Sequence, residues 1–171
     1  GTKDSAGNLV SGNDMILHYV NLDRTYTTFY RKNSKGDYTG KPIRFNRVRF
    51  QHPESHLDRS GKPIKYASPK GSGLQLWYNE VIISAFQRKK KIDTLFIIEG
   101  EKKADLLCQC GLFAIGTSGI HGIQSRGNLH PDISMIVAEL NVKNVVFMVD
   151  SDWCDISQNP GSQSVTLRPS S

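Results

Sequence analysis

The second half of the chain alternates apolar, strand-like runs with helix-like segments, and this order constrains the fold most strongly. The apolar runs are TLFIIEG (94–100), LFAIGTSG (112–119) and NVVFMVDSD (144–152). Helical patterns separate them, in EKKADLLCQCG (101–111) and PDISMIVAELN (131–141). Strands that alternate with helices favour a parallel sheet flanked by helices, because right-handed crossovers bring successive parallel strands together. We therefore expect an α/β core over residues 92–155.

The two expected helices have recognisable boundaries. Gly111 is a typical C-terminal stop for the first helix, and Pro131 stands near the start of the second. In the first helix, the candidate buried positions are Ala104, Leu106, Leu107 and Cys110.

The first half of the chain has a different character. Residues 1–13 are small and polar and predict a flexible lead-in, whereas residues 14–91 predict a β-rich basic subdomain. Short β-favouring runs such as TYTTFYR and IRFNRVRF mix aromatic, β-branched and basic residues, and NSKGDYTGKP (33–42) is typical of a turn between strands. In the second run the apolar residues alternate with Arg44, Arg47 and Arg49, which predicts a strand with a basic face. That face is either a binding surface or the solvated side of an edge strand protected by charge.

The overall composition narrows the functional classes. The formal net charge of +6 is compatible with a polyanionic partner such as nucleic acid. No run is long enough to span a bilayer and the N-terminal residues lack a signal-peptide pattern, so we expect a cytoplasmic protein with no membrane partner. The three cysteines have no zinc-finger spacing and are expected to be reduced thiols. Residues 156–171 form a polar tail, which we interpret as a truncated continuation of the core.

Three acidic residues stand at the ends of the expected strands. Glu99 follows one apolar run, and Asp150 and Asp152 follow another. Ligands of open α/β sheets bind beyond the carboxyl ends of the strands, so the three carboxylates are expected to converge at one edge. A hard cation such as Mg²⁺, or Mn²⁺, relieves their mutual repulsion and leaves positions for phosphate oxygens.

The motifs FIIEGEKKAD, AIGTSGIHG and VVFMVDSD resemble the Toprim signature of bacterial primases, topoisomerases and certain nucleases. The motif EGEKKAD is most similar to Toprim modules in primase-helicase proteins of phages and mobile elements. The whole pattern of motifs is similar to a Toprim-like family of bacterial integrative elements. The strong part of the resemblance covers residues 94–152, and residues 42–80 match more weakly.

The resemblance implies a role for each matching residue. Glu99 is implied as the acid or base of nucleotidyl transfer, and Asp150 and Asp152 as the Mg²⁺ ligands. Lys65 and Lys70 are implied as contacts for nucleic acid or nucleotide. Lys102 and Lys103, beside Glu99, are candidate phosphate contacts or simply an exposed helix face, and the three arginines of the basic strand are further candidates.

The functional expectation is metal-dependent nucleotidyl transfer on DNA or RNA, as part of a primase-like replication protein of a bacterial mobile element. The implied partners are nucleic acid, single-stranded by preference, and a helicase domain in the same parent protein. The alternatives are a Toprim nuclease and a non-catalytic nucleic-acid-binding module. Because the tail after Asp152 is short and no zinc module precedes the core, we expect this chain alone to be a weak or inactive primase.

Overall fold

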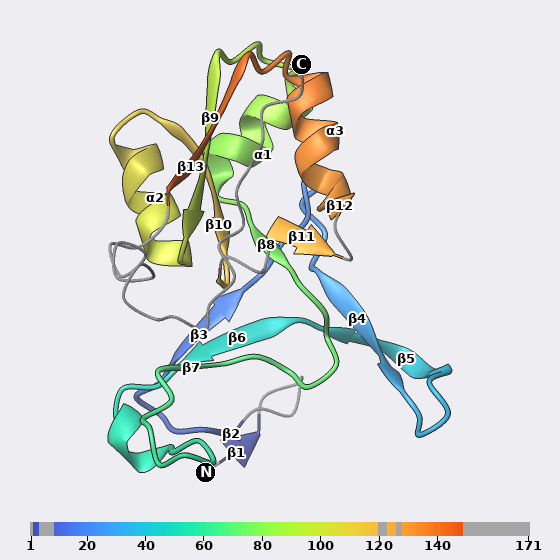
Figure 1. Ribbon diagram of the computed structural model, residues 1–171, viewed down its shortest axis with the longest axis vertical. Coiled ribbons are helices and arrows are strands. Elements are labelled where there is room, and N and C mark those ends of the chain that lie inside the picture. The colour runs from blue at the N-terminus through green and yellow to red at the C-terminus, as the bar shows by residue number, and fades with distance from the viewer. Residues whose placement is uncertain (1, 4–8, 120–122, 126–127, 149–171) are drawn as a thin grey trace, which may run out of the picture.

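A four-stranded sheet in the order β13-β9-β10-β8 is the centre of the α/β core, to which β8 and α1 contribute although both precede residue 92. The computed structural model describes residues 2–3, 9–119, 123–125 and 128–148 (Figure 1). Three strands run parallel, namely β9 (Thr94–Glu99), β10 (Phe113–Thr117) and β13 (Asn144–Met148). The fourth, β8 (Leu76–Trp77), pairs antiparallel with β10. The α/β prediction is confirmed, but the sheet is mixed rather than wholly parallel.

Helices cover both faces of this sheet. α2 (Glu101–Gln109) lies on one side of β9 and β13, while α1 (Glu80–Gln87) and α3 (Pro131–Glu139) lie on the other (Figure 1). This is the arrangement that right-handed crossovers produce when the chain moves first to one side of β9 and then to the other. The core between the layers contains fully buried side chains from both strands and helices, including Leu95, Ile97, Ile115, Ile133 and Ile136.

The buried face of α2 differs from the predicted one. Glu101, Ala104 and Cys108 are buried, whereas Leu106 is 60% exposed and Cys110 is exposed. The prediction was right for Ala104 and wrong for Leu106 and Cys110. Because Gly100 is the N-cap, the helix begins at Glu101, and the spacing 101, 104, 108 places those residues on the face toward β10.

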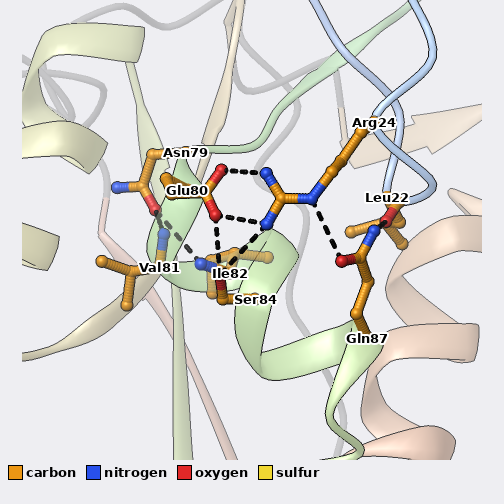
Figure 2. Close-up of polar contacts among 8 residues, drawn as sticks. All are labelled: Leu22, Arg24, Asn79, Glu80, Val81, Ile82, Ser84 and Gln87. Atoms are coloured by element: carbon orange, nitrogen blue, oxygen red, sulfur yellow. Dashed lines mark hydrogen bonds and ion pairs between the residues drawn. The ribbon is translucent and has the colours of Figure 1, made fainter.

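The start of α1 is held by side chains from two parts of the chain (Figure 2). The side chain of Asn79 accepts hydrogen bonds from the backbone N–H groups of Val81 and Ile82, which is a standard N-cap. Both terminal nitrogens of Arg24 donate to the carboxylate of Glu80, and its Nε donates to Gln87. A loop of the first half is thereby tied to the helix that enters the core.

The first half contains two further sheets. β3 (Met15–His18), β6 (Asn46–Arg49) and β7 (Tyr66–Ala67) form a three-stranded antiparallel sheet in the order β3-β6-β7. β4 (Thr28–Lys32) and β5 (Tyr38–Arg44) form a hairpin that extends away from the body of the molecule (Figure 1). The run 43–50 is therefore divided between two strands, and the turn ends at Tyr38 rather than continuing to residue 42.

β6 is the central strand of its sheet. For Arg47 and Arg49 the alternative of a solvated edge strand is therefore wrong, since β6 has hydrogen-bonded neighbours on both sides, whereas Arg44 lies in β5, an exposed strand of a two-stranded hairpin. Arg47 and Arg49 alternate with Asn46 and Val48, which are buried. The alternation leaves the two arginines together on the other face of the sheet.

Short elements complete the described part of the chain. They are β1 (Thr2–Lys3) paired with β2 (Leu9–Val10), the 3₁₀ helix η1 (Pro53–Ser55), and β11 (Gln124–Ser125) paired with β12 (Asn128–Leu129). β1 and β2 fall within residues 1–13, which the sequence predicted to be a loose lead-in. None of the helices described has the length and hydropathy needed to cross a bilayer.

An aromatic junction joins the sheets of the first half to the α/β core. Tyr19, which is 1% exposed, makes edge-to-face contacts with Phe45 in the first half and with Trp77 of β8. Trp77 packs against both hydrophobic clusters, and its Nε1 donates to Asp105 of α2 at 2.7 Å. Trp77 is therefore a packing residue that links the two hydrophobic clusters.

Candidate active site

A pocket of about 450 Å³ opens where β9 and β10 end, and both halves of the chain line it. The three-stranded sheet contributes Arg47 and Arg49 of β6 and Tyr66 of β7, and Lys65 directly precedes β7. The α/β core contributes residues 99–103 together with Thr117 and Ser118. The pocket thus lies at the carboxyl ends of parallel strands, where open α/β sheets bind their ligands.

Glu99 is the last residue of β9 and lines this pocket. It is paired in register with Thr117 of β10, and its side chain has no hydrogen bond or ion pair with any described residue. The next residue, Gly100, has a φ of 102° and donates its N–H to the carbonyl of Thr117 at 2.8 Å. A glycine suits that backbone conformation, which turns the chain from the strand directly into α2.

The glycine turn after β10 passes beside the Glu99 carboxylate. A Cβ atom built on Gly119, whose φ is 152°, would lie 4.0 Å from Oε1 of Glu99. Gly116 has a different role, because a Cβ there would lie 3.1 Å from Cβ of Trp77 and 3.2 Å from the carbonyl oxygen of Gly100. Gly116 therefore lets β8, β9 and α2 approach closely around the pocket.

Glu101 is a charged residue that no sequence pattern singled out. It is 1% exposed, and its Oε1 accepts hydrogen bonds from the hydroxyl of Tyr19 and from Nη1 of Arg47, both at 2.6 Å. Its position in the first turn of α2 also suits a negative charge. Burial, followed by the negative charge of Glu101, raises the pKa of Tyr19 well above its ordinary value. A buried acid with partners distant in sequence leaves no local pattern, so sequence reasoning missed it.

Arg47 and Arg49 project toward the pocket side by side. The guanidinium carbon of Arg47 lies 4.6 Å from the ring centroid of Tyr66, and that of Arg49 lies 6.0 Å from it. Among the described residues, the only buried side-chain nitrogen or oxygen atoms without a hydrogen-bond partner are Nε of Arg47 and Oγ1 of Thr117. Both residues line the pocket, so two polar groups there have unused bonding capacity.

Basic side chains outnumber acidic ones in the described lining of the pocket. Among the residues that the structure describes, five basic side chains line it against two carboxylates, and one of those, Glu101, is already bonded to Arg47 and Tyr19. The basic set comprises Arg47, Arg49, Lys65, Lys102 and Lys103. A concave surface with this excess of positive charge attracts anions, and guanidinium groups bind phosphate in particular.

The structure brings together six of the ten predicted site residues: Glu99, Lys65, Lys102, Lys103, Arg47 and Arg49. Two others lie elsewhere. Lys70 is on an exposed loop outside the pocket lining, and Arg44 stacks on Tyr26 of the first half, with its guanidinium carbon 3.3 Å from the ring centroid. Arg44 points elsewhere because it belongs to β5, whereas Arg47 and Arg49 belong to β6.

The remaining two, Asp150 and Asp152, lie outside the described residues. The last described residue of β13, Met148, is paired with Ile98, which directly precedes Glu99. Within the described ranges no group of three or more His, Cys, Asp or Glu residues is placed to hold a metal ion. The Glu99 carboxylate is the pocket acid whose oxygens are not already used by a described neighbour.

Comparisons with family models, with curated proteins and with solved structures find no match to this chain.

Proposed function

We propose that the pocket is a Toprim-type, metal-dependent phosphoryl-transfer site that acts on DNA or RNA. The observation that carries the proposal is the position of Glu99 at the end of β9, in a pocket lined by five basic side chains. An acid without a described partner supplies proton transfer or a metal ligand, and the basic residues supply phosphate contacts. Both are needed in one place for phosphoryl transfer on a polyanion.

Each residue has a proposed task. Asp150 and Asp152 follow β13 in the sequence and are the proposed Mg²⁺ or Mn²⁺ ligands, with Glu99 as the proton-transfer residue. Oxygen donors such as Glu99 fit a hard cation, which when bound polarises a phosphate oxygen. Arg49 and Lys65 hold the phosphate backbone from the first half of the chain, and Lys102 and Lys103 hold it from α2. Arg47 is positioned by Glu101 and offers its remaining nitrogens to the ligand.

Among phosphoryl-transfer reactions, we propose nucleotidyl transfer of the primase type, within a cytoplasmic replication protein of a bacterial mobile element. A helicase domain in the parent protein is the proposed partner. The support is the resemblance of residues 94–152 to Toprim motifs, together with the basic residues that the first half adds to the pocket. Nuclease cleavage would use the same acids, so extension and cleavage of an end-labelled strand are measured in parallel.

The decisive experiment titrates the chain with Mn²⁺ and measures turnover in the same preparations. We expect weak Mn²⁺ binding by the parent, because substrate phosphates complete the coordination. The double variant Asp150→Asn, Asp152→Asn should lose this binding. Glu99→Gln should retain most of it, while any turnover falls by about a hundredfold or more.

A matched control is Glu54→Gln, which removes an exposed carboxylate on η1, outside the pocket lining. It should change neither Mn²⁺ affinity nor turnover. If the double variant binds Mn²⁺ as well as the parent does, the assignment of the metal to Asp150 and Asp152 is wrong.

A further inference from the structure

The hairpin β4–β5 has two faces of opposite character. Along the first strand and the residues before it, Thr27 and Phe29 are buried, while Tyr26, Thr28 and Tyr30 are exposed. Phe29 packs in the hydrophobic cluster of the first half, with its cross-strand partner Ile43 against it. The buried face therefore anchors the base of the hairpin and fixes which side chains point outward.

The outward face gathers tyrosines and basic residues. We call it the tyrosine face and define it by Tyr26, Tyr30, Lys32, Tyr38 and Arg44. Its three rings are 47%, 46% and 69% exposed, in chain order. Tyr30 and Tyr38 are in edge-to-face contact at 6.2 Å, and Nζ of Lys32 lies 4.8 Å from the Tyr38 centroid. The guanidinium group of Arg44 lies over the ring of Tyr26. Each basic residue of the face therefore lies over a tyrosine ring.

The hairpin also concentrates charge. Residues 26–44 contain five basic residues and one acidic residue, a net charge of +4 within a chain whose formal net charge is +6. Stability does not require exposed rings at these positions, because the buried face already anchors the hairpin. Solvent-exposed rings interleaved with cations are the combination that single-stranded nucleic acid uses, with bases stacking on the rings and phosphates meeting the cations.

We propose that the tyrosine face is a second nucleic-acid contact, outside the pocket, that binds single-stranded DNA or RNA by stacking bases on Tyr26, Tyr30 and Tyr38. A duplex fits less well, because its bases are already stacked and paired and offer no free faces to a ring. The proposal shares only the class of partner with the proposed function. It needs no metal and no catalysis, so the two are tested separately.

The test measures binding of a fluorescently labelled oligothymidine of about 20 nucleotides, long enough for the usual single-strand site sizes. Fluorescence anisotropy is read in EDTA, which removes any contribution from a metal. The triple variant Tyr26→Ala, Tyr30→Ala, Tyr38→Ala should bind about tenfold more weakly or worse. The matching triple Tyr→Phe variant should bind within about twofold of the parent, because it keeps the rings that stack.

The charges of the tyrosine face are tested through salt dependence. Lys32→Ala with Arg44→Ala should reduce the slope of log K against log salt by about 1.4, from two lost phosphate contacts on a single strand. The matched control, Arg59→Ala with Lys62→Ala, removes the same charge from an exposed loop elsewhere and should leave the slope unchanged. An equal loss in both variants would show that only overall charge matters and would overturn the proposal.

A direct reporter covers the case in which the alanine variant is poorly folded. Tyr38→Trp places an indole on the most exposed ring position of the face, and its emission should be quenched when the oligonucleotide saturates the protein. The parent, with its own tryptophans, gives the background. No change in the added emission, or duplex binding as tight as single-strand binding, overturns the proposal. Loss of Mn²⁺ binding in the aspartate variants with oligonucleotide binding intact would bear on the proposed function alone.

Discussion

Arg47 of β6 and Glu101 of α2 form an ion pair between the two halves of the chain, with Nη1 and Oε1 2.6 Å apart. The side chains are 13% and 1% exposed, so the pair is largely withdrawn from solvent. The hydroxyl of Tyr19 bonds to the same carboxylate oxygen. This group connects the basic sheet to the first turn of α2, beside the ends of β9 and β10.

Removing one partner of this pair should be costly. Glu101→Leu leaves Arg47 without its counter-charge and should lower the free energy of unfolding by about 3 kcal/mol. The double variant Arg47→Met, Glu101→Leu should recover much of that loss, because no unpaired charge remains. Urea unfolding of the parent, both single variants and the double variant gives the coupling energy. Additive losses would show that the two residues do not depend on each other.

Two buried tyrosines should make the fold sensitive to alkaline pH. Burial, with the neighbouring Glu101 and Asp132 carboxylates, raises the pKa of Tyr19 and Tyr78 above the ordinary value of 10. Above pH 10 the unfolded chain loses protons that the folded chain keeps, so their contribution to stability, present below pH 10, declines as pH rises. The urea midpoint should fall between pH 8 and pH 11. It should fall less in the Tyr19→Phe, Tyr78→Phe double variant, and an equal fall in both would contradict this assignment.

Gly116 should not tolerate a side chain. In Gly116→Ala the new methyl meets Cβ of Trp77 and the Gly100 carbonyl oxygen at 3.1 and 3.2 Å, so these closely packed neighbours must give way slightly at the junction of β8, β9 and α2. We expect a loss of about 1–3 kcal/mol in thermal or urea unfolding. Gly12→Ala is the matched control, since nothing lies within 4 Å of a Cβ there, and its stability should be unchanged.

The N-cap of α1 should contribute more than the ion pair next to it. Asn79→Ala removes the acceptor for two backbone N–H groups and should cost about 1 kcal/mol. Arg24→Ala should have a clearly smaller effect on the urea midpoint, because Arg24 and Glu80 are 49% and 63% exposed and water screens their charges. The reverse order of effects would show that the ion pair, not the cap, holds the helix.

The elements of the second half were predictable because their signals are local. An apolar run ending at Glu99, a glycine after it and a proline near residue 131 give β9, the turn into α2 and the start of α3. The antiparallel strand β8 was not predicted, because its two residues carry no pattern and their pairing with β10 is set by tertiary packing. The buried face of α2 was misassigned because Glu101, a charged residue, occupies a core position that only Tyr19 and Arg47 make acceptable.

The pocket was predictable only in part. The strand-end position of Glu99 and the neighbouring Lys102 and Lys103 follow from the order of elements alone. The contribution of Arg49 and Lys65 depends on how the first half docks against the core, and no periodicity in the sequence encodes that docking. Arg44 shows the limit of reasoning from spacing, because the boundary between β5 and β6 separates it from Arg47.

The antiparallel pairing of β8 with β10 affects how truncated fragments of the chain should behave. A fragment that begins at residue 92 would lose both β8 and α1, which would expose the edge of β10 that pairs with β8 at Gly116 and Thr117. An exposed strand edge is a template on which further copies can add, so such a fragment should assemble into β-rich aggregates. A fragment that begins at Leu76 retains β8 at the edge of β10 and should remain monodisperse for longer.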